Sequence, residues 1–320
     1  QQIATLYGDN ISASNIVVFP GAQTGMTLSA QALLHEGDHA IVITPSYQSL
    51  EESAKLAGCE ISRVSLSPDT NWQLDIADVE ATIQKNTRYI TLNDPHNPSG
   101  ALLDYDTKVA LIGLAEKYDL LIFSDEVYRL LELNPSERSP SMAELSARAI
   151  ALSTMSKPWG AGGTGIGWAV CQDSVICSQL LRAQHIYAVC FSRAGEIQAM
   201  MALRCSTEII NKNLTIIARN LALLEQYFDL NSDLFDWVAP RAGGTGFVRF
   251  KGPITANQLA EQLLENEILV FPSSIFDCDE SLGQYFRIGF SRIAMPAALE
   301  AFKHYVHNQR SVWQTQITES

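Results

Sequence analysis

Short runs of β-branched and aliphatic residues alternate with stretches of helical periodicity along the first half of the chain. The apolar runs predict strands at residues 15–19, 40–44, 60–65, 89–92, 120–124 and 149–153. Apolar positions at helical spacing predict helices at 23–35, 48–56, 76–83 and 107–118. Strands that are joined by helical crossovers pair in parallel. The alternation therefore predicts an α/β fold, with a mostly parallel central sheet between layers of helices.

The pattern changes after about residue 175. Residues 178–204 and 214–228 have the periodicity of long helices, and strands return only at 246–250 and 269–271. We expect a large domain over residues 1–211 and a smaller C-terminal α+β domain over residues 212–320. Residues 1–7 predict a helix, and because no methionine opens the chain we expect a further segment upstream.

Composition and charge narrow the classes of function. The 320 residues are 47% hydrophobic and 18% charged, which is typical of a globular protein. The net charge of −13 disfavours nucleic acids and anionic membranes, and no apolar run reaches the ~20 residues of a membrane helix. The cysteines lack the paired spacing of a metal site, so we expect buried thiols and no bound metal. They are at positions 59, 171, 177, 190, 205 and 278. We expect a soluble, cytoplasmic protein.

Two turn-rich segments follow predicted strands, where ligands bind in open parallel sheets. The segment Pro-Gly-Ala-Gln-Thr-Gly at 20–25 opens a helix, whose free N–H groups would favour a phosphate. The segment Asp-Pro-His-Asn-Pro-Ser-Gly at 94–100 holds Asn97 between two prolines, as a rigid amide that can bind a ligand. A purely structural turn explains either segment about equally well.

Charged residues beside apolar strands are sharper signals. Asp125 ends a strand expected to be buried, where an acid needs a cation or a donor, so we favour a functional role over capping. Lys157 directly follows another such strand, and desolvation there would lower its pKa and make its amine a nucleophile. Arg287 lies within Tyr-Phe-Arg-Ile-Gly-Phe and predicts a bound carboxylate or phosphate, with a buried ion pair as the alternative.

Taken in order, these segments resemble the class I/II aminotransferases of the aspartate aminotransferase superfamily. These are fold type I enzymes that use pyridoxal 5′-phosphate (PLP). The resemblance extends over essentially the whole chain. It implies transfer of an α-amino group from an amino acid to a 2-oxo acid, in a homodimer with sites at the subunit interface.

The resemblance also implies roles for single residues. Lys157 matches the lysine that forms a Schiff base with the cofactor, and Asp125 matches the aspartate that pairs with the pyridine nitrogen. Asn97 and Tyr128 match the two donors to the cofactor's 3-oxygen, and Tyr47 matches the aromatic residue stacked on its ring. Lys157, Asp125 and Tyr128 form the implied catalytic set.

The two anionic groups also have implied partners. The residues that match the phosphate binders are Ala22, Gln23, Thr154 and Ser156. Arg287 matches the arginine that binds the substrate's α-carboxylate, with Asn97 beside it. This arginine is shared by enzymes for all substrates, so the sequence does not identify the amino acid.

Two positions depart from the family pattern. Asp94 stands where the family usually has asparagine. Gly165 stands eight residues after Lys157, where most members have an arginine that clamps the phosphate. Losing one charge-assisted contact of about 1.5–3 kcal/mol would weaken cofactor binding roughly ten- to hundredfold. Because glycines crowd residues 160–167, we expect a phosphate cup rebuilt from backbone N–H groups and hydroxyls, with no room for an arginine.

Two other functions stay open. A PLP enzyme of the same fold can carry out elimination or cyclisation of a functionalised amino acid, and the missing phosphate arginine favours this alternative. An aminotransferase-like effector domain of a transcription regulator would need a basic DNA-binding module before Gln1. The charge of −13 and the intact set of Lys157, Asp125 and Arg287 disfavour that second alternative.

Overall fold

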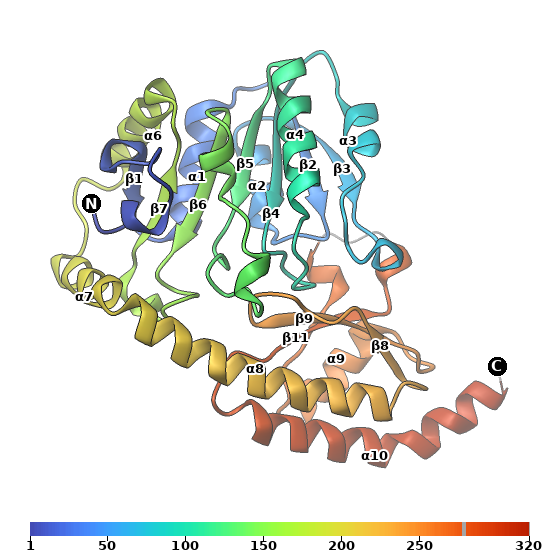
Figure 1. Cartoon of the computed structure of the whole chain (residues 1–320). Coiled ribbons are helices and arrows are strands. Elements are labelled where there is room, and N and C mark those ends of the chain that lie inside the picture. The colour runs from blue at the N-terminus through green and yellow to red at the C-terminus, as the bar shows by residue number, and fades with distance from the viewer. Residues whose placement is uncertain (277–279, 320) are drawn as a thin grey trace.

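The computed structural model describes residues 1–276 and 280–319, which contain two β-sheets (Figure 1). The larger sheet has the strand order β1-β7-β6-β5-β4-β2-β3. Its strands are β1 (Ile16–Phe19), β2 (His39–Thr44), β3 (Glu60–Ser65), β4 (Thr87–Asn93), β5 (Leu121–Asp125), β6 (Ala149–Thr154) and β7 (Gly167–Val170). Strands β2 to β6 pair in parallel, whereas β7 pairs antiparallel with β6 and with β1. The predicted mostly parallel α/β sheet is confirmed.

Helices cover both faces of this sheet (Figure 1). They are α1 (Ala22–Leu33), α2 (Ser49–Leu56), α3 (Ile76–Thr82), α4 (Tyr105–Tyr118), α5 (Met142–Leu145), α6 (Ser174–Tyr187) and α7 (Arg193–Arg204). Side chains alternate along a strand, so neighbouring residues of one strand enter different cores. In β4, Tyr89 packs in the cluster that contains Met26 of α1, whereas Ile90 packs in the cluster that contains Leu111 of α4.

Strand β7 was not predicted, because its glycine-rich approach has the composition of a loop. Gly167 starts this strand at a point where a Cβ atom would collide with the backbone nitrogen of Ala22. Glycine therefore allows β7 to lie against the first residue of α1. This close approach places the start of α1 beside the segment that follows β6.

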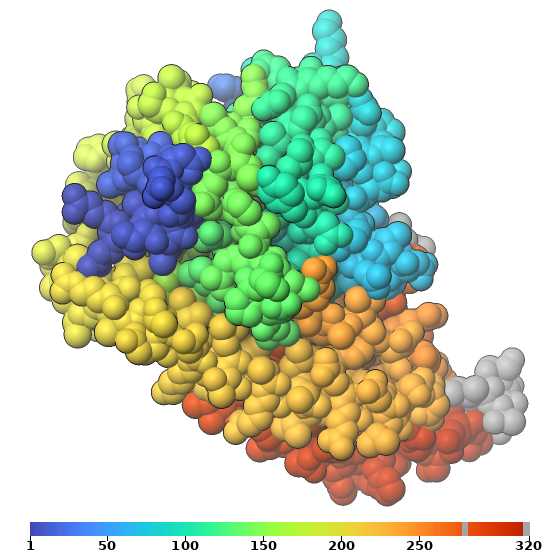
Figure 2. Space-filling view, viewed as in Figure 1, coloured from blue at the N-terminus to red at the C-terminus, as the bar shows by residue number. Residues whose placement is uncertain are grey.

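Two helix predictions are wrong in detail. The helix expected over 178–204 is two helices, α6 and α7, and Ser192 caps the second by accepting from the Gly195 N–H at 3.2 Å. The helix expected over residues 1–7 is only a 3-10 turn at Ala4–Leu6. In Figure 2 these first residues lie on the surface beside the green middle of the chain. Their contacts are with distant residues, which local periodicity does not report.

The second sheet is antiparallel, with the order β10-β11-β9-β8. Its elements are α8 (Ser206–Leu230), β8 (Phe235–Trp237), β9 (Thr245–Phe250), α9 (Ala256–Glu265), β10 (Phe271–Pro272), β11 (Tyr285–Gly289) and α10 (Met295–Glu319). Phe235, Phe286 and Phe302 join β8, β11 and α10 in one aromatic core. Residues 211 and 212 lie inside α8, so the domain boundary predicted there falls within one helix and stays a prediction.

Five of the six cysteines lie in the described residues, and none of these five forms a disulfide. Cys59, Cys171 and Cys177 are buried, as predicted, whereas Cys190 and Cys205 are exposed, so the prediction is wrong for these two. Cys278 lies outside the described residues. Within the described ranges, none of the helices has the length and apolar character needed to cross a membrane.

Candidate active site

A cavity of about 370 Å³ lies where the large sheet's strands end. Its lining residues are Gly21, Ala22, Gln23, Met26, Tyr47, Asn97, Asp125, Val127, Tyr128, Thr154, Ser156, Lys157 and Arg287. The structure thus brings together every residue that the sequence predicted for the site, from segments up to 265 positions apart (287 − 22). Their individual roles remain predictions.

Three lining residues were not predicted as site residues. Gly21 ends the loop before α1, and Met26 lies one helical turn after Ala22, on the same face of α1. The helical period places Met26 there once Ala22 is assigned to the site. Val127 lies between Asp125 and Tyr128, and no pattern in the sequence distinguishes it from a core residue.

Asp125 is a buried carboxyl at the end of β5, with only 3% of its surface exposed. Its Oδ1 accepts from the Val127 N–H at 3.3 Å, and its backbone carbonyl accepts from Asn93 Nδ2 at 2.6 Å. Burial raises the pKa of Asp125 to about 7, while that hydrogen bond and the charge of Lys157 lower it. Asp125 forms no ion pair within the described ranges, so it can accept a cationic donor from a ligand.

Lys157 follows β6 by three residues, and its side chain is exposed to the cavity. The Nζ atom lies 5.3 Å from the centroid of the Tyr128 ring. The expectation that the protein buries this lysine away from water is therefore wrong. The carboxyl end of β6 lies at the cavity and not in the core, so the side chain stays exposed. The amine is accessible to a ligand that enters there.

One end of the cavity has the donors of an anion site. Gly21 precedes α1 with a φ of 93°, so the first N–H groups of α1 are directed out of the helix beside Ala22 and Gln23. Thr154 Oγ1 donates to Ser156 Oγ at 3.1 Å, which leaves the Ser156 hydroxyl hydrogen for another acceptor. A helix N-terminus with hydroxyl groups beside it suits a phosphate.

Gly165 lies near this end, and its conformation corrects one expectation. Its backbone is left-handed, with φ 63° and ψ 32°. A Cβ atom at this position would meet nothing within 4 Å. The expectation that an arginine has no room is therefore wrong at the Cβ position, whereas the need for positive φ is confirmed.

The other end of the cavity carries a cation. Arg287 lies on β11 and donates from Nη1 to Asn97 Oδ1 at 2.9 Å. Its guanidinium lies 4.8 Å from the centroid of the Phe271 ring, and burial lowers its pKa. Among the residues that the structure describes, Arg287 has no carboxylate partner. The alternative role of Arg287, a buried ion pair within the protein, is therefore not found there. The guanidinium is available to an anionic ligand.

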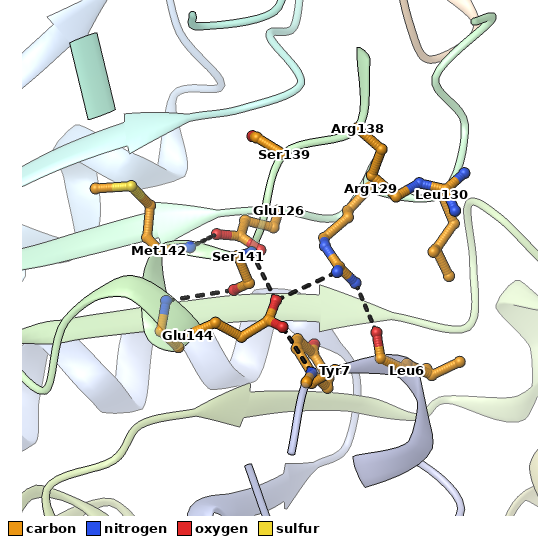
Figure 3. A network of polar contacts seen from close by, with 12 residues as sticks. Leu6, Tyr7, Glu126, Arg129, Leu130, Arg138, Ser139, Ser141, Met142 and Glu144 are labelled. Atoms are coloured by element: carbon orange, nitrogen blue, oxygen red, sulfur yellow. Dashed lines mark hydrogen bonds and ion pairs between the residues drawn. The ribbon is translucent and has the colours of Figure 1, made fainter. Parts of the chain in front are cut away.

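A buried polar network lies behind residues 125–129 (Figure 3). Asp125 and Tyr128 line the cavity, whereas Glu126 and Arg129 belong to this network. Arg129 donates from Nη1 to the Leu6 carbonyl at 3.0 Å and from Nη2 to Glu144 Oε2 at 3.3 Å. The same segment thus contributes to the cavity and anchors the N-terminal residues.

The comparisons with known proteins agree with this geometry. The model of the family "Aminotransferase class I and II" matches residues 1–302. Capreomycidine synthase from Streptomyces vinaceus is 29% identical over 273 residues, which are 85% of this chain and 68% of that protein. An aspartate aminotransferase from Pyrococcus horikoshii is 27% identical over 281 residues, 84% of this chain and 70% of that protein.

A solved structure shows the same fold. A PLP-dependent aminotransferase from Streptococcus suis has a TM-score of 0.88 at 27% identity, and the match covers 96% of this chain and 80% of that one. The cavity fits this cofactor: Asp125 is a buried acid that forms no ion pair with any residue the structure describes, the Lys157 amine is accessible, and the start of α1 offers N–H groups to a phosphate. The chain therefore belongs to the aminotransferase class I and II family and is a PLP-dependent aminotransferase of fold type I.

Proposed function

We propose that the residues around the cavity divide between binding the cofactor, moving protons and binding the substrate. Bound PLP supplies an aldehyde that condenses with amino groups and a ring that accepts electrons when a bond to Cα breaks. Asp125 holds the proton on the pyridine nitrogen, and Tyr47 stacks on the ring. Tyr128 donates to the 3-oxygen together with Asn97, whose Nδ2 is not used by its hydrogen bond to Arg287.

Proton transfer at the substrate is the role of Lys157. Its Nζ would take the proton from the substrate Cα and deliver it to the aldehyde carbon of the cofactor. The open position of this amine in the cavity supports the assignment. Burial is the main cause that raises the pKa of Asp125 to about 7, and a positive charge on the ring nitrogen would lower it, so the acid stays ionised beside the cofactor.

The two ends of the cavity bind the two anions. The N–H groups of Ala22 and Gln23 and the hydroxyl of Ser156 bind the cofactor phosphate, and Thr154 takes part by orienting that hydroxyl. Arg287 binds the α-carboxylate of the substrate through its planar guanidinium. In this proposal the phosphate is bound beside the large sheet, and the carboxylate is bound by an arginine of the small sheet.

The observation that carries the proposal is that Lys157, Asp125 and Arg287 meet at one cavity from three separate segments. The test incubates the purified holoenzyme with a panel of α-amino acids, with and without a 2-oxo acid. Conversion that requires the 2-oxo acid supports transamination and identifies the preferred substrate. Product that forms equally well without an acceptor contradicts it.

A second function has one observation in its favour. The relative from Streptomyces vinaceus, at 29% identity over 85% of this chain, is named a synthase, not a transaminase. The alternative is elimination or cyclisation of a functionalised amino acid at the same residues. In the same assay, a cyclic product or an eliminated group that appears without any 2-oxo acid would favour this alternative.

The proposal includes a homodimer in the cytoplasm. Large apolar side chains are exposed on α6, on α7 and between them: Leu181, Ile186, Tyr187, Val189, Ile197 and Met201. A monomer rarely exposes so many in one region, so a second copy covering them supports dimer formation. Light scattering measures the mass directly. The five unpaired cysteines support a reducing compartment, which cell fractionation tests.

A further inference from the structure

The loop formed by residues 94–100 lies where the two sheets meet at the cavity. Asn97 in this loop accepts the hydrogen bond from Arg287 of the small sheet. The Gly100 carbonyl accepts from the N–H groups of Arg241 and Ala242 at 2.8 and 2.9 Å. A Cβ atom at Gly100 would lie 2.6 Å from the Pro240 Cβ, so the contact is close. The position of this loop therefore decides where Asn97 holds the guanidinium.

Asp94 anchors the start of this loop. Its N–H donates to the Asp125 carbonyl at 3.0 Å, and its Oδ1 accepts from the Leu103 N–H at 3.0 Å. Its Oδ2 forms an ion pair with Lys108 Nζ, which lies on the first turn of α4. Lys108 also donates to Ser139 Oγ at 2.7 Å. The backbone N–H of Asp94 thus ties the loop to β5, and its carboxylate ties the loop to α4.

The ion pair is removed from water. The side chains of Asp94 and Lys108 are 3% and 5% exposed. Burial lowers the pKa of Lys108, but the negative charges of Asp94 and Glu126 more than compensate and raise it overall. Lys108 therefore stays charged and needs an anion in direct contact. Asp94 is the carboxylate in direct contact with this ammonium. Glu126 Oε1 accepts from the Met142 N–H.

An asparagine at position 94 would not replace this carboxylate. Its amide oxygen can still accept from the Leu103 N–H. It would leave the Lys108 ammonium buried without its ionic partner, which is a costly arrangement. The loop would then shift to bring other acceptors or water to Lys108. Asp94 and Lys108 are matched to each other, and the sequence motif alone showed only one member of the pair.

We propose that the buried Asp94–Lys108 ion pair positions Asn97 and Arg287 to bind the carboxylate of the substrate. Neither residue lines the cavity, so both are positioning residues that act through the loop. The inference rests on the proposed role of Arg287. It goes further because it assigns the strength of carboxylate binding to a pair outside the cavity.

The test measures ligand binding to the holoenzyme by the change in cofactor absorbance. One ligand is 2-aminoisobutyrate, which has an amino group and a carboxylate but no Cα hydrogen, so it does not turn over. The other is tert-butylamine, in which a methyl group replaces the carboxylate. In Asp94→Asn we expect the Kd of 2-aminoisobutyrate to rise about tenfold, while that of tert-butylamine stays unchanged.

Variants of the partner and a double variant test whether the pair acts as a unit. Lys108→Met should raise the same Kd by a similar factor. Asp94→Asn combined with Lys108→Met removes both charges of the pair, so neither partner is left buried with an unpaired charge, and the double variant should fold even if a single variant does not. Its Kd for 2-aminoisobutyrate should be no higher than that of either single variant. Additive losses would contradict a paired role.

A matched control separates positioning from stability. Glu51 is 1% exposed and forms ion pairs with Arg63 and Lys55 on the large sheet's side of the molecule. Glu51→Gln should lower the melting temperature and leave the Kd of 2-aminoisobutyrate unchanged. If Asp94→Asn likewise lowers only the melting temperature, the ion pair is merely structural and the inference is wrong.

A further variant keeps the failure of this inference distinct from that of the proposed function. Arg287→Gln should remove the preference of the wild type for 2-aminoisobutyrate over tert-butylamine. If that preference survives, the role proposed for Arg287 is wrong. If Arg287→Gln removes the preference but Asp94→Asn and Lys108→Met keep it, only the positioning role is overturned.

Discussion

The two ends of the cavity offer donors to anions by different physical means. The end proposed for the phosphate uses the start of α1 and the hydroxyls of Thr154 and Ser156, and all of them belong to the large sheet's side. The end proposed for the carboxylate uses the guanidinium of Arg287, which the small sheet supplies. The first depends on local backbone geometry, whereas the second depends on how two sheets are placed against each other. A change in either should therefore affect one ligand and spare the other.

We expect the largest effect when Lys157, whose amine is accessible in the cavity, is replaced. Lys157→Ala should lower kcat by at least about 10³-fold, because the cavity is lined by no other amine from the described residues to move the Cα proton. Both anion sites stay intact, so the variant should still bind PLP. Steady-state kinetics and a PLP titration measure the two effects. Peptide mapping after borohydride reduction of the wild type should find the cofactor on Lys157, and an adduct at another lysine would contradict the assignment.

The next largest effect is expected at Asp125, which we propose to pair with the pyridine nitrogen of the cofactor. Asp125→Asn should lower kcat by about 10²- to 10³-fold with a smaller change in PLP affinity, because an amide does not hold the proton on the pyridine nitrogen. Normal turnover in this variant would show that the ring is used differently.

Asp125 also predicts a pH effect on stability. Its pKa is raised from 3.8 in the unfolded chain to about 7 by burial, so the folded protein binds this proton more tightly. Without cofactor, stability should fall by a few kcal/mol as pH rises from about 4 to about 7. Urea unfolding of the apoprotein should show this loss in the wild type, and Asp125→Asn should be flatter over the same range.

The carboxylate end is tested by Arg287→Gln. The KM for the amino acid and for the 2-oxo acid should each rise roughly ten- to hundredfold, since a charge-assisted contact of about 1.5–3 kcal/mol is lost. PLP affinity should be unchanged, because the other end of the cavity is untouched. A loss of PLP affinity as large as the rise in KM would contradict the division between the two ends.

The phosphate end is tested by the mirror variant, Ser156→Ala. Its hydroxyl donates to an anionic phosphate in this proposal, and such a hydrogen bond is worth about 1.5–3 kcal/mol, so PLP affinity should fall roughly ten- to hundredfold. The KM values should not change once the enzyme is saturated with cofactor. Titration of the apoprotein gives the affinity, and a rise in KM at saturating PLP would be the opposing result.

The smallest effect is expected at Gly165. If the phosphate cup is built from N–H groups and hydroxyls, Gly165→Arg should leave PLP affinity unchanged or slightly weaker, because the left-handed backbone disfavours the side chain. Gly165→Asn is the control, since asparagine tolerates this conformation. If Gly165→Arg, but not Gly165→Asn, binds PLP more tightly with the fold intact, the phosphate cup has not been rebuilt. The missing arginine would then simply weaken PLP binding.

Local pattern was sufficient for the parts of the fold that follow one periodicity. The apolar runs of β2 and β6 are buried on both faces, and their predicted ranges agree with the structure to within a residue. Strand β7 was missed because glycine, which it needs for contact with α1, is also typical of loops. The break between α6 and α7 was missed because apolar spacing continues through residues 188–192.

The sequence by itself determined most of the strand-and-helix order, the motifs and their resemblance to one family, because these depend on neighbours along the chain. The sequence predicted the site residues as a set. It did not predict the ion pair of Asp94 with Lys108, nor the hydrogen bond from Arg287 to Asn97. Exposure of Lys157 was also decided only by the tertiary structure. Burial and ion pairing depend on which distant surfaces meet, and a local pattern of residues contains no information about that.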